Sequence, residues 1–287
     1  MISLTDKQTL DFHRDGFVFV DKLISDSTIK ELKDAFDKIF SGQFETGVRP
    51  DEVNWQEGES NPTKTRQICN AWKGNLKIAK TSLREDIGKA CAKLGGWPGA
   101  RIQVDNALWK PPGVGSIGMH RDCSYLSWLN PREMISCWIA LDDTTADGGT
   151  MELVTGSHQW SPTDQLGEFH DPTDYQALMR ASALAEGVGK PEIVPVLVEK
   201  GSGSFHHGWT WHGSGPNTSG AHRRALVVHC ISSEAHFVSE NISVGTGPIY
   251  GRYRHQDSER MDESFFPILW SDNDGRTHWL DNVSDEW

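Results

Sequence analysis

Residues 223–230 read Arg-Arg-Ala-Leu-Val-Val-His-Cys, an apolar run that opens with two arginines. Side chains two positions apart share one face of an extended strand. One face therefore carries Arg223, Ala225, Val227 and His229, and the other carries Arg224, Leu226, Val228 and Cys230. A buried arginine at the start of a strand needs a partner, and a carboxylate held by two parallel hydrogen bonds fits a guanidinium best.

Other short apolar runs come before this strand in the chain. Candidate strands cover residues 101–109, 136–141, 150–154, 193–198 and 203–206, and turn sequences rich in glycine separate several of them. Many short strands divided by turns are typical of two-layered all-β folds. The sequence therefore predicts a sandwich or a jelly roll.

Helical patterns precede this region. We expect a short helix over residues 5–12, a strand over 17–20 and a helix over about 25–42 with a Ser-Asp-Ser cap. Residues 75–94 have a mixed pattern that is mostly helical. The predicted class is therefore mainly β with flanking helices.

The chain shows no internal repeat and no linker, so we expect one domain over residues 1–287. Its predicted parts are a helical lead-in with a loop over about 1–95, a β core over about 100–232 with a polar insertion at 161–190, and a C-terminal extension over 233–287. The aromatic residues of the extension either pack back on the core or form a dimer surface; they are Phe265, Phe266, Trp270, Trp279 and Trp287.

Two segments are candidates for shaping a pocket. The first is residues 43–75, a long polar stretch that contains Trp55 and Trp72. The second is the Tyr-Gly-Arg-Tyr-Arg segment at residues 250–254. Its arginines, Arg252 and Arg254, either meet an anionic substrate or form ordinary surface ion pairs.

Charge and cysteine content limit the classes of function. The net charge of −12 and the pI near 5.4 argue against a nucleic-acid or anionic-membrane binder, since no cluster of lysine and arginine is available to neutralise phosphates. Five cysteines without paired spacing predict reduced thiols. The first residues lack a signal-peptide pattern, and no apolar run is long enough to cross a bilayer. We expect a cytoplasmic protein.

The first candidate site is the tripeptide His120-Arg121-Asp122. In an extended strand His120 and Asp122 point to the same side, where an imidazole and a carboxylate could bind one metal ion. His212 is the candidate third ligand. This set would form a facial triad of two histidines and one carboxylate, which leaves three adjacent positions of an iron ion open for a co-substrate and O2.

A His-x-Asp pair is common by chance, so the motifs around it matter. The ordered set is Phe12-His13-Arg14-Asp15-Gly16-Phe17, Lys110-Pro111-Pro112-Gly113, His120-x-Asp122, Asp147-Gly148-Gly149-Thr150, Gly156-Ser157-His158, His212-Gly-Ser-Gly-Pro-Asn217 and Arg223. This set resembles the phytanoyl-CoA dioxygenase family of Fe(II)- and 2-oxoglutarate-dependent oxygenases over about residues 5–232. The resemblance implies a double-stranded β-helix core, which is the cupin-like jelly roll.

The resemblance also implies a role for particular residues. His120, Asp122 and His212 would bind iron, and Arg223 and Ser214 would bind the distal carboxylate of 2-oxoglutarate. Further candidates for the wall of the co-substrate pocket are Gln103, Trp138 and Thr150. For Gln103 and Trp138 the alternative is an ordinary side chain that faces the barrel interior.

The remaining histidines raise one question of geometry. Strict alternation places His206 on the face of His212, whereas the extra histidine of the family matches His207; a bulge at Gly208 would reconcile the two. Because three protein ligands suffice, other histidines are expected to be hydrogen-bonded polar residues; these are His158, His222 and His229.

The implied activity is oxidative decarboxylation of 2-oxoglutarate to succinate and CO2, coupled by O2 to hydroxylation of an unactivated C–H bond in a small molecule. Ascorbate is expected to stimulate it. Asp122 argues for hydroxylation, because related halogenases carry a small residue at that position. The expected assembly is a monomer or a homodimer. The alternatives are a binding module without catalysis and a cupin-like metalloenzyme that does not use 2-oxoglutarate.

Overall fold

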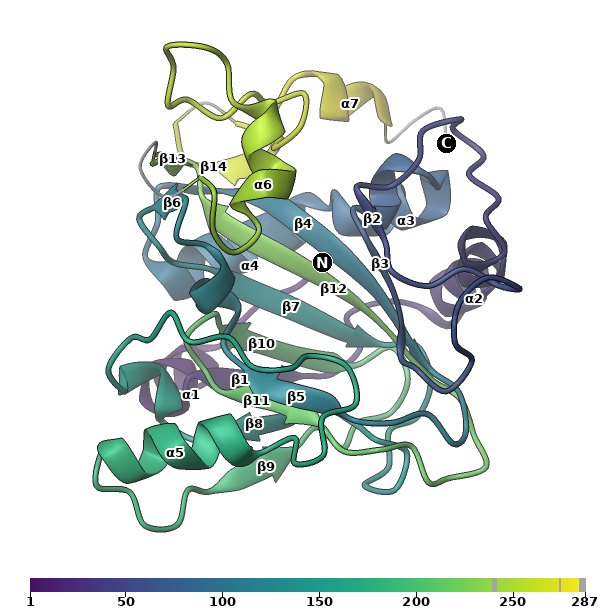
Figure 1. Ribbon diagram of the computed structural model, residues 1–287. Helices are drawn as coiled ribbons and strands as arrows, with labels where there is room; N and C mark the ends of the chain where they lie inside the picture. The colour runs from purple at the N-terminus through teal and green to yellow at the C-terminus, as the bar shows by residue number, and fades with distance from the viewer. Residues whose placement is uncertain (239–241, 274, 284–287) are drawn as a thin grey trace.

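The computed structural model describes residues 1–238, 242–273 and 275–283 and contains two antiparallel sheets with helices packed around them (Figure 1). The predicted class, mainly β with flanking helices, is confirmed. Trp287, one of the aromatic residues singled out in the sequence, lies outside the described residues.

The larger sheet has the order β1-β10-β7-β12-β4-β3-β2, and β14 pairs with β4. Its strands are β1 (Phe17–Val20), β2 (Glu52–Val53), β3 (Arg66–Cys69), β4 (Gly99–Lys110), β7 (Ile135–Ala140), β10 (Gly203–His207), β12 (Arg223–Ser232) and β14 (Ile268–Ser271). The smaller sheet has the order β5-β11-β8-β9, and its strands are β5 (Ile117–His120), β8 (Glu152–Val154), β9 (Ile193–Pro195) and β11 (His212–Ser214). A separate pair joins β6 (Leu129–Asn130) to β13 (His236–Phe237).

The helices are α1 (Asp6–Asp15), α2 (Asp26–Phe40), α3 (Leu76–Ser82), α4 (Glu85–Gly95), α5 (Ala177–Ala185), α6 (Gly247–Tyr250) and α7 (Trp279–Val283). The two N-terminal helices begin at hydrogen-bonded caps, since the hydroxyls of Thr5 and Ser25 accept backbone N–H groups of α1 and α2. The helical stretch expected over 75–94 forms two helices, because the chain turns between α3 and α4.

Strand β12 has the two faces that alternation predicts. Leu226, Val228 and Cys230 belong to a core cluster that contains apolar side chains of α2, α3 and α4. Ala225 and Val227 belong to another cluster, which also includes residues of β8 in the smaller sheet. The helices therefore cover one face of the larger sheet, and the smaller sheet packs against the other face, where Arg223 and His229 also lie.

Three strands of the larger sheet come from segments without a strand pattern. The 43–75 segment supplies β2 and β3, and β3 pairs with β4. The C-terminal extension supplies β14, which pairs with the other end of β4. These strands are two to four residues long, so their side-chain pattern is too short to reveal them.

The aromatic residues of these segments pack inside the protein. Trp55 is buried against Phe40, and Trp72 stacks on Trp279 with ring centroids 6.4 Å apart. Phe266 is buried as well. Of the two expectations for the C-terminal extension, packing against the core is therefore observed for these side chains.

All five cysteines are buried and free. Among the residues described, none of the helices combines the length and the apolar character needed to cross a membrane.

Candidate metal centre

Two histidines face each other across neighbouring strands of the smaller sheet. His120 ends β5 and His212 begins β11, and the two residues are paired in register. Their ring centroids are 4.3 Å apart. The Nδ1 atom of His120 donates to the Gly118 carbonyl (2.8 Å), and that of His212 donates to the Thr210 carbonyl (2.9 Å). These bonds place the ring proton on Nδ1 and leave both Nε2 atoms free to bind a metal ion.

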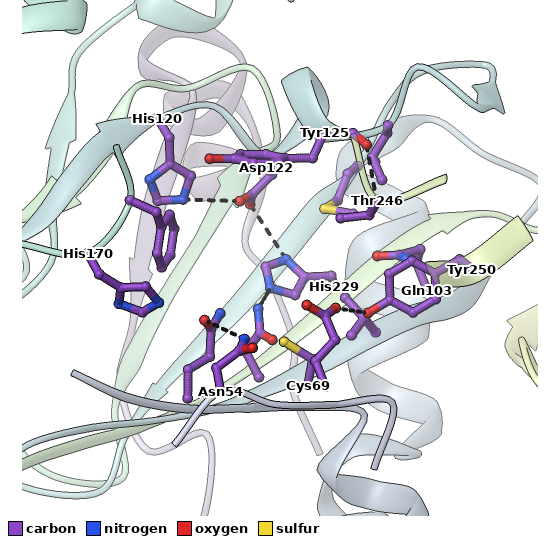
Figure 2. Close-up of a pocket in the computed structure, with 17 residues that line it drawn as sticks. Asn54, Cys69, Gln103, His120, Asp122, Tyr125, His170, His229, Thr246 and Tyr250 are labelled. Atoms are coloured by element: carbon purple, nitrogen blue, oxygen red, sulfur yellow. Dashed lines mark hydrogen bonds and ion pairs between the residues drawn. The ribbon is translucent and has the colours of Figure 1, made fainter. Parts of the chain in front are cut away.

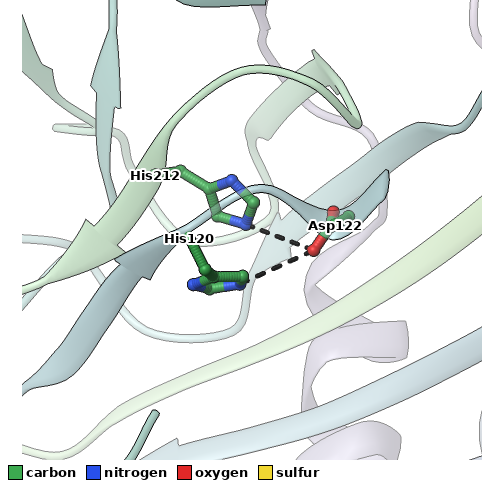
Figure 3. A group of neighbouring side chains, drawn as sticks. All are labelled: His120, Asp122 and His212. Atoms are coloured by element: carbon green, nitrogen blue, oxygen red, sulfur yellow. Dashed lines mark ion pairs between the residues drawn. The ribbon is translucent and has the colours of Figure 1, made fainter. Parts of the chain in front are cut away.

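Asp122 completes the group. Its Oδ1 atom lies 3.6 Å from Nε2 of His120 and 3.5 Å from Nε2 of His212. Figure 3 shows both imidazoles turned toward this one oxygen. Asp122 begins a 3-10 helix (η2, Asp122–Tyr125) instead of continuing the strand. The expected geometry survives because Arg121 keeps an extended backbone, with φ −123° and ψ 125°.

The donor set fits a divalent metal ion. The three ligand atoms lie within 4.8 Å of one another, and metal–ligand bonds of about 2.1 Å place adjacent donors about 3 Å apart, so only a small contraction is needed. Burial tends to raise the pKa of Asp122, but His212 and His229 hold it well below its usual value. Burial lowers the pKa of His120, whereas Asp122 outweighs burial and raises the pKa of His212. Metal binding must therefore displace a proton from His212 at low pH.

The second oxygen of Asp122 is held by a chain of hydrogen bonds. Asn106 Nδ2 donates to Nε2 of His229 (3.0 Å), so the proton of this ring sits on Nδ1 and is donated to Ser136 Oγ (2.7 Å). The hydroxyl of Ser136 in turn donates to Oδ2 of Asp122 (3.1 Å). This network turns Oδ1 toward the two histidines. His229 is thus a hydrogen-bonded residue near the site, as expected.

A narrow cavity leads from the three ligands toward β12. Its walls include His120, Asp122, His206, Trp138, Ser214 and Arg223. At the far end, Nε and Nη2 of Arg223 donate to the Gly149 carbonyl (3.1 and 2.7 Å), while Nη1 has no partner among the described residues. Gly149 has φ +63°, and a Cβ there would lie 2.8 Å from the Gly215 carbonyl oxygen, so the Asp-Gly-Gly-Thr motif permits this close approach.

Two buried cations meet at this end of the cavity. Lys110 Nζ donates to Ser214 Oγ (2.8 Å) and to the Gly215 carbonyl. Burial lowers the pKa of Arg223 to about 10, and burial together with Arg223 lowers the pKa of Lys110 well below its usual value. Neither cation forms an ion pair within the described residues. A small anion with a carboxylate at this end, such as 2-oxoglutarate, fits the free Nη1 donor and the unbalanced charge.

The other candidates for co-substrate contact lie in three different places. Trp138 lines this narrow cavity, and the Arg223 guanidinium lies 5.9 Å from its ring. Thr150 is buried, and its hydroxyl donates to the Val196 carbonyl (2.7 Å). Gln103 lines a second, larger cavity on the other side of the ligands.

The structure answers the question about the paired histidines. His206 is 1% exposed, lines the narrow cavity and has its Nε2 atom 3.5 Å from Asp122 Oδ2. Neither of its ring nitrogens has a hydrogen-bond partner among the described residues. His207 lies elsewhere and packs against Phe12 and His158. Strict strand alternation therefore predicts the inward histidine correctly.

The larger cavity has a volume of about 290 Å³. Figure 2 shows its labelled walls, which include Asn54, Gln103, Tyr125, His170 and Tyr250 as well as two of the ligands. Both cavities are lined by His120 and Asp122, so the candidate metal centre borders both of them. Phe169, from the 161–190 insertion, lies 4.9 Å from the His120 ring and lines both cavities.

The profile of the phytanoyl-CoA dioxygenase (PhyH) family matches residues 12–225, most of the chain. The chain belongs to this family. The dioxygenase cdmD of Talaromyces verruculosus is 26% identical over 253 residues, with 78% of this chain and 74% of the relative covered. A probable alpha-ketoglutarate-dependent hypophosphite dioxygenase of Stutzerimonas stutzeri is 25% identical over 229 residues, covering 77% and 76%. The predicted family and the dioxygenase class are confirmed.

The fold of this PhyH-family protein is also found in solved structures. The epimerase SnoN, crystallised with Fe3+, alpha ketoglutarate and nogalamycin RO, superposes with a TM-score of 0.67 at 19% identity and covers 92% of this chain and 98% of its own. The likeness shows that the arrangement of sheets and helices is shared.

Sequence reasoning missed several residues around the centre. Lys110 begins the Lys-Pro-Pro-Gly motif, but the sequence did not indicate what its side chain does. Ser136 and Asn106 were not predicted to lie near the metal centre. A weak signal existed for Ser136, because it begins the predicted strand that contains Trp138. For Asn106 the sequence offered none, since its partner His229 is 123 positions away.

Proposed function

We propose that this dioxygenase hydroxylates an unactivated C–H bond of a small molecule with Fe(II), 2-oxoglutarate and O2. The observation that carries the proposal is the narrow cavity that connects the His120, Asp122 and His212 donors to the free Nη1 of Arg223. A dianion with two carboxylates needs a cation at each end, and this cavity offers a metal site and a guanidinium.

Each residue has a proposed task. His120, Asp122 and His212 would hold the iron through Nε2, Oδ1 and Nε2. Arg223 would donate to the distal carboxylate of 2-oxoglutarate, and Ser214 would hydrogen-bond the same group. Trp138 would close the side of the cavity and exclude water from it.

The iron and 2-oxoglutarate, when bound, would supply the oxidation: O2 gives one oxygen atom to succinate and one to the substrate, and CO2 is released. The chain itself must hold the substrate C–H beside the metal and keep water out. Phe169, packed on His120, serves the second purpose. Asp122 fills a ligand position with its carboxylate, which favours hydroxylation over transfer of a bound halide.

Several finer features belong to the same proposal. The two sheets would form the halves of a double-stranded β-helix, and residues 1–287 would act as one oxygenase domain with the insertion and the C-terminal extension as its cover. The protein would work in the cytoplasm as a monomer or a homodimer, on a small molecule and not on nucleic acid or membranes. Ascorbate would keep the iron reduced and stimulate turnover.

The test is succinate formation by purified protein supplied with Fe(II), ascorbate and 2-oxoglutarate. Slow succinate production is expected without a substrate, and His212→Ala should abolish it because only two ligands remain. The exposed His255→Ala is the matched control and should leave the rate unchanged. Succinate production that survives in His212→Ala would contradict the proposal. A binding module without catalysis predicts no succinate from the wild type, and an enzyme independent of 2-oxoglutarate predicts turnover without it.

A further inference from the structure

We propose that the larger cavity recognises a compact substrate that carries a protonated amine, and that Glu52 binds this amine. The inference rests on the proposed function, since it places the substrate opposite the co-substrate at the same metal centre. It concerns the cavity of about 290 Å³ that adjoins His120 and Asp122.

Glu52 is one of the residues that line this cavity. It belongs to β2, where it pairs with Cys69 of β3, and both residues line the cavity. The hydroxyl of Tyr250 donates to Oε1 of Glu52 (2.8 Å). Figure 2 places Tyr250, the hydrogen-bond partner of Glu52, and His120 on opposite sides of the cavity.

Within the described chain, Glu52 forms no ion pair with a lysine or arginine. Its partners are neutral, namely the Tyr250 hydroxyl and the Cys69 thiol. Two nearby cations pair with Asp51, the residue before Glu52. Lys73 Nζ lies 2.8 Å from Asp51, and Arg252 forms an ion pair with the same carboxylate. Glu52 is therefore left as a carboxylate that faces a cavity without a counter-ion.

The other residues that line the cavity also favour a positively charged substrate. Among the described residues that line the cavity, there is no lysine or arginine. A substrate bearing phosphate or carboxylate would thus meet Glu52 without a compensating cation. Neither Arg252 nor Arg254 lines this cavity: Arg252 pairs with Asp51, in line with the alternative of an ordinary ion pair, and Arg254 donates to the Ser258 carbonyl (3.0 Å).

The middle of the cavity offers hydrogen bonds and apolar contact together. Gln103 is 2% exposed, and its Nε2 atom has no partner within the described chain. The Nδ2 atom of Asn54 donates to Oε1 of Gln67 (3.2 Å), which leaves the amide nitrogen of Gln67 as a further donor. Tyr125 and Phe169 supply aromatic surface beside His120. The substrate class is therefore a small amine with an acceptor group and an apolar part.

Size narrows the class further. Cavities for drug-sized ligands span about 300–1,000 Å³, and this one, at about 290 Å³, lies just below that range. It suits a free small molecule and cannot enclose a nucleotide carrier such as coenzyme A. The C–H to be oxidised would lie at the His120 end, with the ammonium group near Glu52.

The experiment compares three probes of nearly equal size, benzylamine, benzyl alcohol and benzoate. Each is titrated by calorimetry into the full-length protein loaded with Fe(II) and 2-oxoglutarate without oxygen. Benzylamine should bind more tightly than the other two. Glu52→Gln keeps a hydrogen-bond acceptor for Tyr250. It should lower the affinity for benzylamine at least about tenfold, as expected for loss of a hydrogen bond between charged groups. Glu57→Gln, on the exposed side of the same segment, should bind like the wild type.

Two outcomes overturn the inference: benzylamine that binds no better than benzoate or benzyl alcohol, including no measurable binding, and a benzylamine preference that persists in Glu52→Gln. Succinate formation without substrate, measured on the same preparations, separates the two proposals. If succinate forms at the normal rate but benzylamine is not preferred, only the inference about the amine is contradicted. If no succinate forms, the titration is repeated without Fe(II) and 2-oxoglutarate. A preference for benzylamine that persists there contradicts only the proposed function.

Discussion

The ammonium nitrogen of Lys110 lies 2.8 Å from the hydroxyl oxygen of Ser214, and both residues are buried. Arg223 Nη2 approaches the same oxygen at 3.4 Å. Ser214 therefore stands between two cations at the end of the narrow cavity. Their mutual repulsion, together with burial, is a cost to the free protein that a bound dianion would relieve.

Lys110→Met should change the stability of the protein and its binding of 2-oxoglutarate in opposite directions. Removing one of two buried like charges should raise the melting temperature of the protein without 2-oxoglutarate, by a few degrees for about 1 kcal/mol. The additional stabilisation that saturating 2-oxoglutarate provides should become smaller, because one cation near its carboxylate is lost. Thermal unfolding with and without 2-oxoglutarate tests both effects. A lower melting temperature combined with unchanged stabilisation by 2-oxoglutarate would argue against this role of Lys110.

Arg223→Ala should raise the KM for 2-oxoglutarate at least about tenfold, because one or more charge-assisted hydrogen bonds to the carboxylate disappear. Arg224→Ala is the matched control: this neighbour points to the other face of β12 and pairs with Asp142 at 3.0 Å. Its KM should stay within about twofold of the wild type. Steady-state succinate assays measure both, and equal effects of the two substitutions would contradict the assignment.

Ser136→Ala should weaken iron binding by about 10- to 100-fold, the usual effect of removing a hydrogen bond that orients a metal ligand. The hydroxyl of Ser136 donates to Asp122 Oδ2, and without it the carboxylate can rotate. Ser204→Ala on the adjacent strand is the control, because the Ser204 hydroxyl is buried and has no partner among the described residues. Competition with a metal chelator gives the affinities. Loss of iron to the same extent in both variants would show that Ser136 acts only through folding.

Asp105 should make the stability of the fold depend on pH. Burial raises its pKa to about 7, although Ser82 (2.6 Å) and the Trp72 amide donate to it. A carboxyl with a raised pKa in the folded state stabilises the fold below its unfolded pKa, and this contribution is lost as pH rises through about 7. In Asp105→Asn this dependence is absent. The variant should gain stability relative to the wild type between pH 4 and 8, on the order of 4 kcal/mol. Urea unfolding across this range measures the difference, and parallel pH profiles would disprove it.

Local sequence patterns predicted the elements that depend on near neighbours. The cap at Ser25, the two faces of β12 and the inward position of His206 follow from hydrogen bonds and alternation within a few residues. The candidate ligand set could be proposed for a related reason, since His120 and Asp122 are two positions apart and the motif around His212 is distinctive. Functional residues that lie close together in the sequence can be recognised without knowledge of the fold.

The tertiary structure alone decided what surrounds these ligands. The register of His120 with His212 joins residues 92 positions apart, and the pairing of β2 with β3 turns Glu52 into the larger cavity. Lys110 meets Ser214 across 104 positions. Gln103, a candidate for the wall of the co-substrate pocket, lines the larger cavity. Such contacts depend on strand register and on how two sheets pack, and neither is specified by the few residues at each end. The sequence by itself thus determined the metal-binding motif and the family, whereas the packing of distant segments decided the shape and charge of the space where a substrate would bind.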